Sequence, residues 1–321
     1  MRSLQRNLPF LATLVVCLAL YAAAALRYEG FASLRVLINF LGDNSFLGIA
    51  ALGLTFVILS GGIDLSVGAV IGLVSVGLAL ALEKWHLHAA LAIPLVLAAG
   101  ALFGGVQGGL IQWFALPPFL VTLGGMFFAR GLAYLLSLES LPITHYLDAI
   151  SSSLRVPLGQ FDLPATAIVF LLVFAGALVL AHFTRFGRNI YALGGSEVSA
   201  ALMGLPVART KVGVYALSGF CSALAGVVYC LYTQSGNPNA GGGLELDAIA
   251  AVVIGGTLLS GGVGYVAGTV VGVLIFGIIQ TAIVFQGTLS SWWTKIVIGV
   301  LLLAFILLQK TIQAKKFRPA K

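Results

Sequence analysis

Charged side chains are scarce in this chain of 321 residues. Asp, Glu, Lys and Arg make up 8% of the sequence and hydrophobic residues 60%, whereas a soluble domain averages about 25% charged residues. A soluble protein of this length could not solvate its surface with so few charges. The composition therefore predicts an all-α membrane protein that crosses the bilayer many times, organised as a single transmembrane domain over residues 1–321.

Catalytic and metal-binding patterns are missing from the sequence. It has no G-x-x-x-x-G-K-S/T loop, so it does not hydrolyse ATP by that route, and it has no H-E-x-x-H segment. The three cysteines lie in apolar runs and the four histidines are scattered, which indicates core packing rather than metal binding or disulfides. We therefore expect no enzyme activity, metal or cofactor in this chain.

Ten apolar segments are candidate spans, because a full crossing takes about 20 apolar residues and a broken helix takes fewer. The segments are 9–27, 36–59, 65–83, 89–113, 117–137, 164–184, 210–232, 246–259, 263–286 and 290–309. The segment 246–259 is short for a full crossing, which is typical of half a helix. The apolar start is interpreted as a retained first helix, since its small residues are not arranged as a cleavage site.

Positive charges orient these spans, because Lys and Arg favour the cytoplasmic side. Ten spans with a cytoplasmic N-terminus also place the C-terminus in the cytoplasm. Eleven of the seventeen basic residues then lie inside: Arg2, Arg6, Arg185, Arg188, Arg209, Lys211, Lys310, Lys315, Lys316, Arg318 and Lys321. The basic tail 310–321 either serves topology alone or also binds anionic lipid.

A short phrase occurs twice, each time interrupting a long apolar run. The copies begin at Leu59 and Leu259 and share Ser-Gly-Gly and a later Gly at matching positions. In lipid a broken backbone must hydrogen-bond to protein or to water in a cavity, so two breaks indicate a pathway. We expect Asp64 to cap the half-helix that follows the first break. The residues assigned to the broken helices and to gating are Ser60, Gly61, Gly62, Asp64, Ser66, Gly68, Gly255, Gly256, Ser260, Gly261 and Gly262.

The predicted cytoplasmic loop 185–211 contains a short amphipathic helix. Ser196 is its expected N-cap and Pro206 its expected end. Val198, Leu202 and Leu205 form one apolar stripe of this helix. The residues alone allow the helix to lie on the membrane or to dock in a partner's groove.

Polar residues also occur inside the spans or at their outer ends. Arg130 is predicted either to line or gate a pathway, or to snorkel or pair structurally. Neutral amides and hydroxyls suit a polyhydroxylated ligand, but they also join helices to one another. At the outer segment 232–247, Glu245 and Asp247 either compensate a helix dipole or help to contact such a ligand or its carrier protein.

Three blocks of this sequence together resemble the signature of the membrane permeases of bacterial ABC importers for ribose, xylose and galactose. They are residues 60–68, 185–195 and 245–262, and the likeness extends over residues 36–310. The resemblance implies a permease subunit in the bacterial cytoplasmic membrane that forms the path for a monosaccharide. It also implies a periplasmic sugar-binding protein, a second permease chain (homologous or identical), and two copies of a cytoplasmic ATPase that bind ATP and Mg. No nucleic acid is expected as a partner.

The same resemblance assigns roles to residues in this chain. It implies that the loop is a coupling helix seated in a groove of the ATPase, formed by Gly194, Gly195, Ser196, Glu197, Ala200, Leu202, Gly204 and Leu205. The candidates for the sugar path are Asn44, Phe46, Gln107, Thr122, Arg130, Gln234 and Gln280.

The expected sugar follows from three further segments. Residues 43–49, 126–128 and 287–296 are similar to the permease subunits of galactofuranose importers within this family. Two positions depart from the family pattern. Ser196 stands where Asn is frequent, and Gln286 stands where an acid is expected, which bears on the outer gate or the binding-protein contact.

Two rival functions fit the apolar composition. An ion-coupled secondary transporter would need a buried titratable group or an ion cage, and Arg130 has no evident acidic partner at midplane depth. A non-transporting membrane scaffold would not need the two glycine pairs. Replacement of those pairs by alanine would leave a scaffold functional but should stop uptake by a permease.

Overall fold

The computed structural model describes the whole chain except residues 1, 145–146, 148–153, 159–160, 291 and 317–321. The helices are α1 (Arg2–Arg27), α2 (Leu34–Asp43), α3 (Ser45–Leu59), α4 (Val67–Ala79), the π-helix η1 (Leu80–Lys84), α5 (Ala89–Trp113), α6 (Pro118–Leu136), α8 (Ala165–Phe183), α9 (Arg185–Gly195), α10 (Glu197–Leu202), α11 (Val207–Thr233), α12 (Leu244–Ile254), α13 (Val266–Gln286) and α14 (Trp292–Lys316). The described strands are β1 (Leu141–Pro142), β2 (Val156–Leu158), β3 (Phe161–Leu163) and β4 (Ser235–Gly236). β1 pairs with β4 and β2 pairs with β3, both antiparallel.

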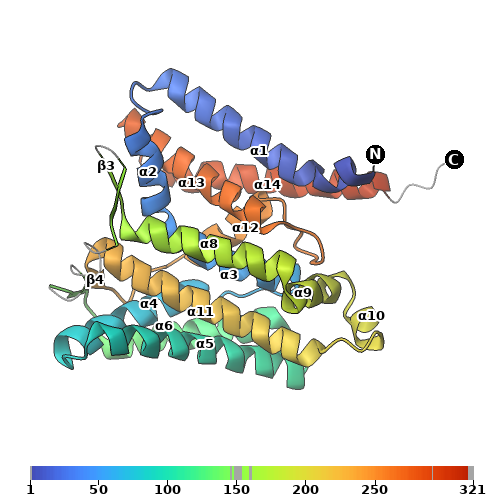
Figure 1. Ribbon diagram of the computed structural model, residues 1–321, viewed down its shortest axis with the longest axis horizontal. Helices are drawn as coiled ribbons and strands as arrows, with labels where there is room; N and C mark the ends of the chain where they lie inside the picture. The colour runs from blue at the N-terminus through green and yellow to red at the C-terminus, as the bar shows by residue number, and fades with distance from the viewer. Residues whose placement is uncertain (1, 145–146, 148–153, 159–160, 291, 317–321) are drawn as a thin grey trace.

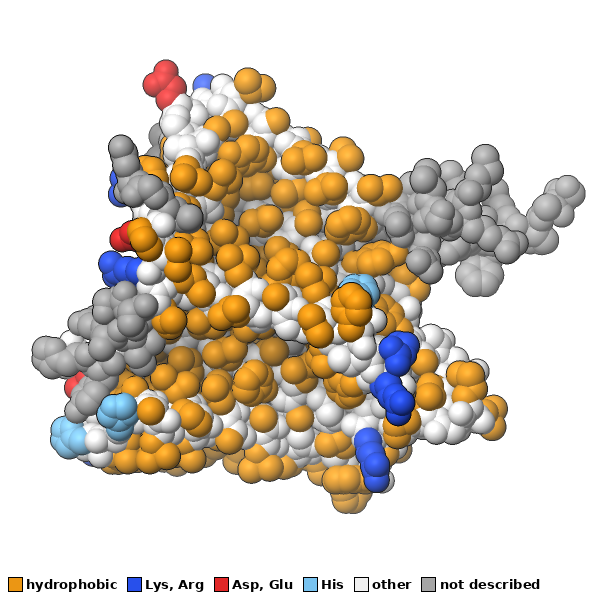
Figure 2. All heavy atoms as spheres, in the orientation of Figure 1, with side chains coloured by type: hydrophobic (Ala, Val, Ile, Leu, Met, Phe, Trp, Pro, Cys, Tyr) orange, Lys and Arg blue, Asp and Glu red, His pale blue; other side chains and the backbone are white. Residues whose placement is uncertain are grey.

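The long helices lie side by side in one bundle, with α9, α10 and the strands at its two ends (Figure 1). The start of α1, helices α9 and α10 and the end of α14 share one end, and the strands lie at the other. We name these the inner and the outer end, after the predicted topology. Figure 2 shows a broad hydrophobic band between the two ends on the face in view. Residues 317–321 of the basic tail lie outside the described residues, and residues 310–316 continue α14.

The predicted all-α architecture is confirmed, and each of the ten predicted segments falls on one helix or, for 36–59 and 65–83, on two consecutive helices. Among the described residues, seven helices are long and apolar enough to cross a membrane, or eight if α2 and α3, bent by 55°, count as one span. α14 contributes a shorter apolar stretch, Trp292–Leu307. α12 has 11 residues and is thus about 16 Å long, half of the hydrocarbon core. The short eighth segment is therefore half a helix.

The centre of the bundle is built around α3, α4 and α11. In the apolar stretch of α11, 72% is buried inside the protein, and in that of α4 with η1 the buried share is 78%. The corresponding share in α6 is only 17%. Small residues let the backbones approach closely: a Cβ atom on Gly104 of α5 would lie 2.1 Å from the carbonyl oxygen of Tyr215 of α11. The central helices are therefore fixed by protein contacts, and α5 and α6 turn much of their surface outward.

Candidate functional site

Three glycine segments that are far apart in the sequence meet at the inner end. The Gly262 N–H donates to the carbonyl oxygen of Leu59 over 2.9 Å. A Cβ atom on Gly194 would lie 1.8 Å from the same oxygen, and one on Gly261 would lie 2.8 Å from Cα of Gly61. Backbone thus packs directly on backbone, and we call this contact of Leu59, Gly61, Gly194, Gly261 and Gly262 the inner junction.

Both broken helices end in the same way. Behind α3, the N–H groups of Gly61 and Gly62 donate to the carbonyl oxygens of Ile58 and Val57, each over 2.9 Å. This is a Schellman cap, which needs a left-handed residue, and Gly61 has φ +83°. Behind α12 the equivalent glycine is Gly256, with φ +94°. The sequence repeat pairs Gly61 with Gly261, but the cap residue that corresponds to Gly61 in the structure is Gly256. Gly261 lies several residues beyond the end of α12.

The second break is held against α13. A Cβ atom on Gly255 would lie 2.4 Å from the carbonyl oxygen of Gly268, so α12 and α13 touch through backbone. Ser260 is exposed at the surface of the break. The hydroxyl of Tyr191, on α9, donates to the carbonyl oxygen of Gly264 over 3.0 Å. α9 is thus joined to this break by a hydrogen bond as well as by the inner junction.

The predicted loop helix exists as α10, but it ends before the predicted residue. Ser196 is its N-cap as predicted, since its Oγ accepts from the N–H of Ser199 over 3.2 Å. The prediction that Pro206 ends it is wrong. A Schellman cap at Gly204, with φ +74° and the Leu205 N–H donating to the carbonyl oxygen of Ala200, stops the helix at Leu202.

α10 presents apolar side chains at the inner end. Val198 is 72% exposed and Leu202 is 84% exposed, while Ala200 is buried against the bundle. Leu205 lies beyond the C-terminal end of α10 and is half-buried. It therefore does not belong to the apolar stripe of this helix. Glu197 forms an ion pair with Lys211 over 2.6 Å. The exposed part of the predicted stripe is therefore Val198 and Leu202.

Asp64 lies buried in the first break, with a hydrogen-bonding pattern that differs in part from the prediction. The N-cap of α4 is Ser66, without a side-chain cap bond. Asp64 Oδ1 accepts from the N–H and the hydroxyl of Ser66 over 2.9 and 2.7 Å, and Oδ2 accepts from the hydroxyl of Ser218 over 2.7 Å. The carboxyl group therefore joins the start of α4 to α11 rather than serving as the cap residue.

Two partners in this network were not predicted. Ser218 carries the contact from α11, and its only sequence signal is the pair Ser218 and Ser222, spaced to share one face of an apolar helix. Tyr215 adds a weaker contact, since its hydroxyl donates to the carbonyl oxygen of Ile63 over 3.4 Å. Gln107 extends the network to α5 by donating from Nε2 to Ser66 Oγ over 3.0 Å.

The N-terminus of α4 meets the N-terminus of the half-length helix α12 inside the bundle. A Cβ atom on Gly68, in the first turn of α4, would lie 2.2 Å from the carbonyl oxygen of Gly241 and 2.3 Å from Oε2 of Glu245, in the first turn of α12. Helix N-termini carry partial positive charge, which carboxylates stabilise. Asp64 and Glu245 occupy these two ends. Helix N-termini at the breaks of discontinuous helices occur at the substrate sites of many membrane transporters.

Arg130 of α6 holds the non-helical segment that leads to α12. Its Nη1 donates to the carbonyl oxygens of Pro238 and Ala240 over 2.5 and 2.9 Å. The Asn237 N–H donates to Ser75 Oγ of α4 over 3.1 Å. The segment therefore runs along α4 into the bundle, and backbone oxygens are the hydrogen-bond acceptors of Arg130.

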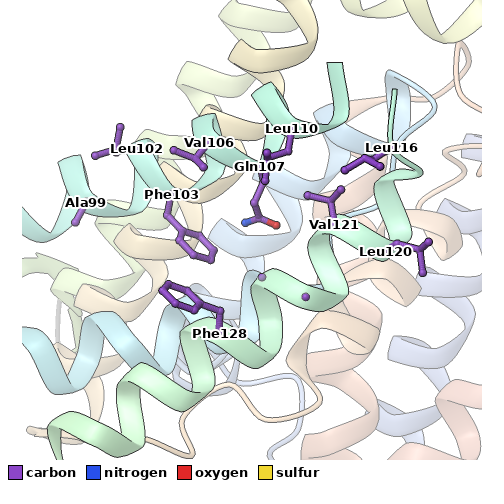
Figure 3. A pocket seen from close by; sticks show the side chains of 12 residues that line it. Ala99, Leu102, Phe103, Val106, Gln107, Leu110, Leu116, Leu120, Val121 and Phe128 are labelled. Carbon is purple, nitrogen blue, oxygen red and sulfur yellow. The ribbon is translucent and has the colours of Figure 1, made fainter. Parts of the chain in front are cut away.

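A cavity of about 700 Å³ lies between α5 and α6. Its walls are hydrophobic except for Gln107, which points between the two helices (Figure 3). Phe103 and Phe128 stack across it, with ring centroids 6.4 Å apart. Oε1 of Gln107 is buried and has no hydrogen-bond partner within the described part of the chain. This amide is the polar group that faces the cavity.

The other candidate sugar-path residues do not form one cluster. Thr122 adjoins the first break, where its hydroxyl makes a long contact with the carbonyl oxygen of Ile63 over 3.4 Å; it also donates to the carbonyl oxygen of Pro118 in its own helix over 2.9 Å. Asn44 lies at the bend between α2 and α3, and Phe46 packs edge-on against Tyr229. Gln234 ends α11 at the outer end, and Gln280 is exposed on α13. Their assignment to a sugar path stays a prediction.

Comparison with known proteins gives a consistent result. A family model described as branched-chain amino acid transport system / permease component matches residues 36–306. The chain is 52% identical to the inner membrane ABC transporter permease protein YjfF of Escherichia coli strain K12, over 96% of this chain and 93% of that protein. It is 39% identical to the fructose import permease protein FruG of Bifidobacterium longum, over 97% and 93% of the two chains.

A third relative also carries a sugar name. The chain is 37% identical to the ribose import permease protein RbsC of Haemophilus influenzae, over 94% of this chain and 93% of that protein. No solved structure matches the chain at a significant level. The resemblance to sugar importer permeases, stated from three sequence blocks, is therefore confirmed.

Proposed function

The chain belongs to the family of transport-system permease components that matches residues 36–306, and from this membership we propose that it forms the path for a monosaccharide through the membrane. It is a multi-pass permease subunit of an ABC sugar importer, from a family without catalytic activity of its own. The relatives named for fructose and ribose favour a sugar over the amino acids named in the family description.

The partners follow from this role. A cytoplasmic ATPase, present in two copies that bind ATP and Mg, docks at the inner end, where α10 exposes Val198 and Leu202. A periplasmic binding protein delivers the sugar at the outer end, and a second permease chain supplies the other half of the path. The name of the relative from Escherichia coli supports placing the chain in the inner membrane.

The inner junction is the observation that carries the proposed mechanism. Gly194 lies in the last turn of α9 and touches both Leu59 and Gly262 through backbone. A movement of the loop around α10 therefore reaches the two broken helices without passing through flexible side chains. Packed elements of this kind move as rigid bodies between discrete arrangements. The sugar and the ATPase must each bind the two arrangements with different affinity, because equal affinity shifts nothing.

Galactofuranose is the sugar we propose. The support is the similarity of residues 43–49, 126–128 and 287–296 to permeases of galactofuranose importers. Gln286, the departure noted in the sequence, accepts a hydrogen bond from the Tyr28 hydroxyl over 2.8 Å and joins the outer ends of α13 and α1. The ligand that copurifies with the partner binding protein decides between galactofuranose and another monosaccharide.

Reconstituted vesicles test the proposed function. The chain is reconstituted with its second permease, ATPase and binding protein. The vesicles should import labelled sugar only when ATP is present on the side of the membrane that carries the ATPase. Uptake should survive collapse of the proton gradient. Uptake that persists without ATP and stops when the gradient collapses would show an ion-coupled transporter instead.

A substitution in α10 tests the docking surface separately. Leu202→Asp places a charge on the exposed apolar side chain and should abolish sugar-stimulated ATP hydrolysis. Ser199→Asp adds the same charge to an exposed residue off the predicted stripe and should retain most of the stimulation. Equal loss in both variants, or no loss in either, would contradict an apolar seat for α10.

A further inference from the structure

A second cavity, near the outer end, differs in chemistry from the apolar one between α5 and α6. It has a volume of about 630 Å³ and lies between α13 and α14, with Gln280, Trp292, Thr294 and Lys295 among its lining residues. We call it the outer cavity. Gln280 is six residues before the end of α13, so it lies about 9 Å inward from that end.

An exposed ion pair borders this cavity. Lys295 of α14 bonds to Oδ2 of Asp247 of α12. The side chain of Lys295 is 50% exposed and that of Asp247 is 21% exposed. Lys near a helix end usually extends toward the membrane surface, but here the ammonium group is held by a carboxylate on a neighbouring helix.

Asp247 lies well inward from the outer end, at the surface of the bundle. It sits in the first turn of α12, and Glu245 in the same turn touches Gly68 at the start of α4. α4 and η1 continue outward from Gly68 to Lys84, which is about 24 Å of helix. Charged groups at such depth are costly against lipid and almost always face a cavity, water or protein. The ion pair therefore indicates that the surface around it meets water or protein rather than hydrocarbon.

We propose that the face formed by α12, α13 and the start of α14 is this chain's wall of the sugar path, and that the outer cavity is where the incoming sugar first binds. The inference rests on the proposed function and adds the location and the chemistry of the site. The cavity opens on the surface of the chain, so the second permease chain closes it from the opposite side.

The lining suits a neutral monosaccharide. The Gln280 amide both donates and accepts, as sugar hydroxyls require, and the Thr294 hydroxyl does the same. The indole ring of Trp292 offers an apolar face and a polar N–H. Asp247 balances the charge of Lys295 while leaving further ammonium donors for hydroxyls. The site has polar groups without net charge, which favours a sugar over an anion.

Cysteine labelling tests whether this face is in water. The native cysteines Cys17, Cys221 and Cys230, all buried, are replaced by alanine, and single cysteines are introduced. Gln280→Cys and Val284→Cys, both at the outer cavity, should react with a charged, membrane-impermeant methanethiosulfonate reagent in the assembled complex. Leu172→Cys on α8, which is 66% exposed on an apolar face, is the matched control and should stay unreactive.

The outcomes separate this inference from the proposed function. Labelling of Gln280→Cys at the rate of the Leu172→Cys control would overturn the inference even if the wild-type complex imports sugar. A complex that imports no sugar but shows the labelling contrast would refute the proposed function and leave a water-lined face in place.

Uptake kinetics test the ligand. Gln280→Leu removes the amide at nearly constant size and should raise the KM of sugar uptake at least fivefold, with Gln280→Asn closer to wild type. Loaded binding protein should also slow labelling of Gln280→Cys. An unchanged KM in Gln280→Leu, with no protection from labelling, would show that sugar does not bind in this cavity.

Discussion

The inner junction and the outer half of the chain are held together by different kinds of contact. At the inner junction, backbone packs on backbone: the Gly262 N–H donates to Leu59 and no side chain intervenes. In the outer half, backbone contacts such as Gly68 on Gly241 are joined by side-chain links, from Arg130 to two carbonyl oxygens and from Lys295 to Asp247. The backbone contacts of the inner junction can pass a movement from one helix to the next as a rigid body. The side-chain contacts of the outer half leave a cavity and polar groups that can hydrogen-bond a ligand.

This comparison predicts different tolerance to substitution. A backbone contact cannot accept even one added carbon, because the opposing atoms have no rotamers to change. A side-chain contact accepts a replacement that keeps the hydrogen-bonding group. Even a single added methyl group at the inner junction should therefore impair transport. In the outer half, only a substitution that removes the hydrogen-bonding group should do so.

Among the variants compared by sugar uptake, Gly261→Ala should have the largest effect. Its Cβ would lie 2.8 Å from backbone atoms of Gly61, and overpacking costs about 1–3 kcal/mol, so sugar uptake should fall about tenfold or more. Gly30→Ala is the matched control, because Gly30 has φ +79° against +82° for Gly261 but nothing within 4 Å. Initial rates of uptake in vesicles compare the two. Equal loss in both variants would assign the effect to backbone strain instead of the junction.

Asp64→Ala should come next. It leaves the Ser66 N–H, the Ser66 hydroxyl and the Ser218 hydroxyl without their buried acceptor, and each unsatisfied group costs about 1–3 kcal/mol. Asp64→Asn keeps one acceptor oxygen and offers an amide to Ser218, so it should retain most of the stability. Thermal unfolding in detergent measures both. An Asn variant as unstable as the Ala variant would show that the charge itself is needed.

Arg130 tests a side-chain link in the outer half. Arg130→Met removes both hydrogen bonds to the segment that leads to α12 and should lower the maximal rate of uptake by about tenfold, since charge-assisted bonds contribute about 1.5–3 kcal/mol each. Arg130→Lys keeps a charged donor and should recover part of the rate. Uptake kinetics of the two variants decide; a Met variant with wild-type rate would contradict a positioning role.

The ion pair of Glu197 and Lys211 should matter least. Glu197 is exposed, and exposed pairs contribute about 0–1 kcal/mol. Glu197→Gln should therefore shift the unfolding temperature by a few degrees at most and leave uptake within about twofold. A large loss of ATPase stimulation, without loss of stability, would instead place Glu197 in the contact with the ATPase.

The sequence alone predicted the fold well because the signals are local. Apolar run length located the helices, the shortness of segment 246–259 indicated a half-helix, and Ser196 was found as an N-cap from its chemistry. The error at Pro206 has a local cause too: Gly204 can close a Schellman cap and stop α10 at Leu202, before the chain reaches the proline.

The site was predicted only in part because its contacts are long-range. Each glycine segment was identified, but nothing in the sequence shows that Gly194 packs between Leu59 and Gly262. Ser218 and Lys295 are ordinary polar residues until the fold brings Asp64 and Asp247 beside them. The repeated Ser-Gly-Gly phrase also misled on one point, since the helix before the second copy ends at Gly255 and Gly256.

Two adjacent glycines give the most direct test of the inner junction. A Cβ atom on Gly194 would lie 1.8 Å from the Leu59 carbonyl oxygen, whereas one on Gly195 would meet nothing within 4 Å. We predict that, in reconstituted complexes, Gly194→Ala abolishes the stimulation of ATP hydrolysis by sugar-loaded binding protein and Gly195→Ala retains it. Retained stimulation in Gly194→Ala, in a complex that assembles normally, would contradict transmission through the inner junction.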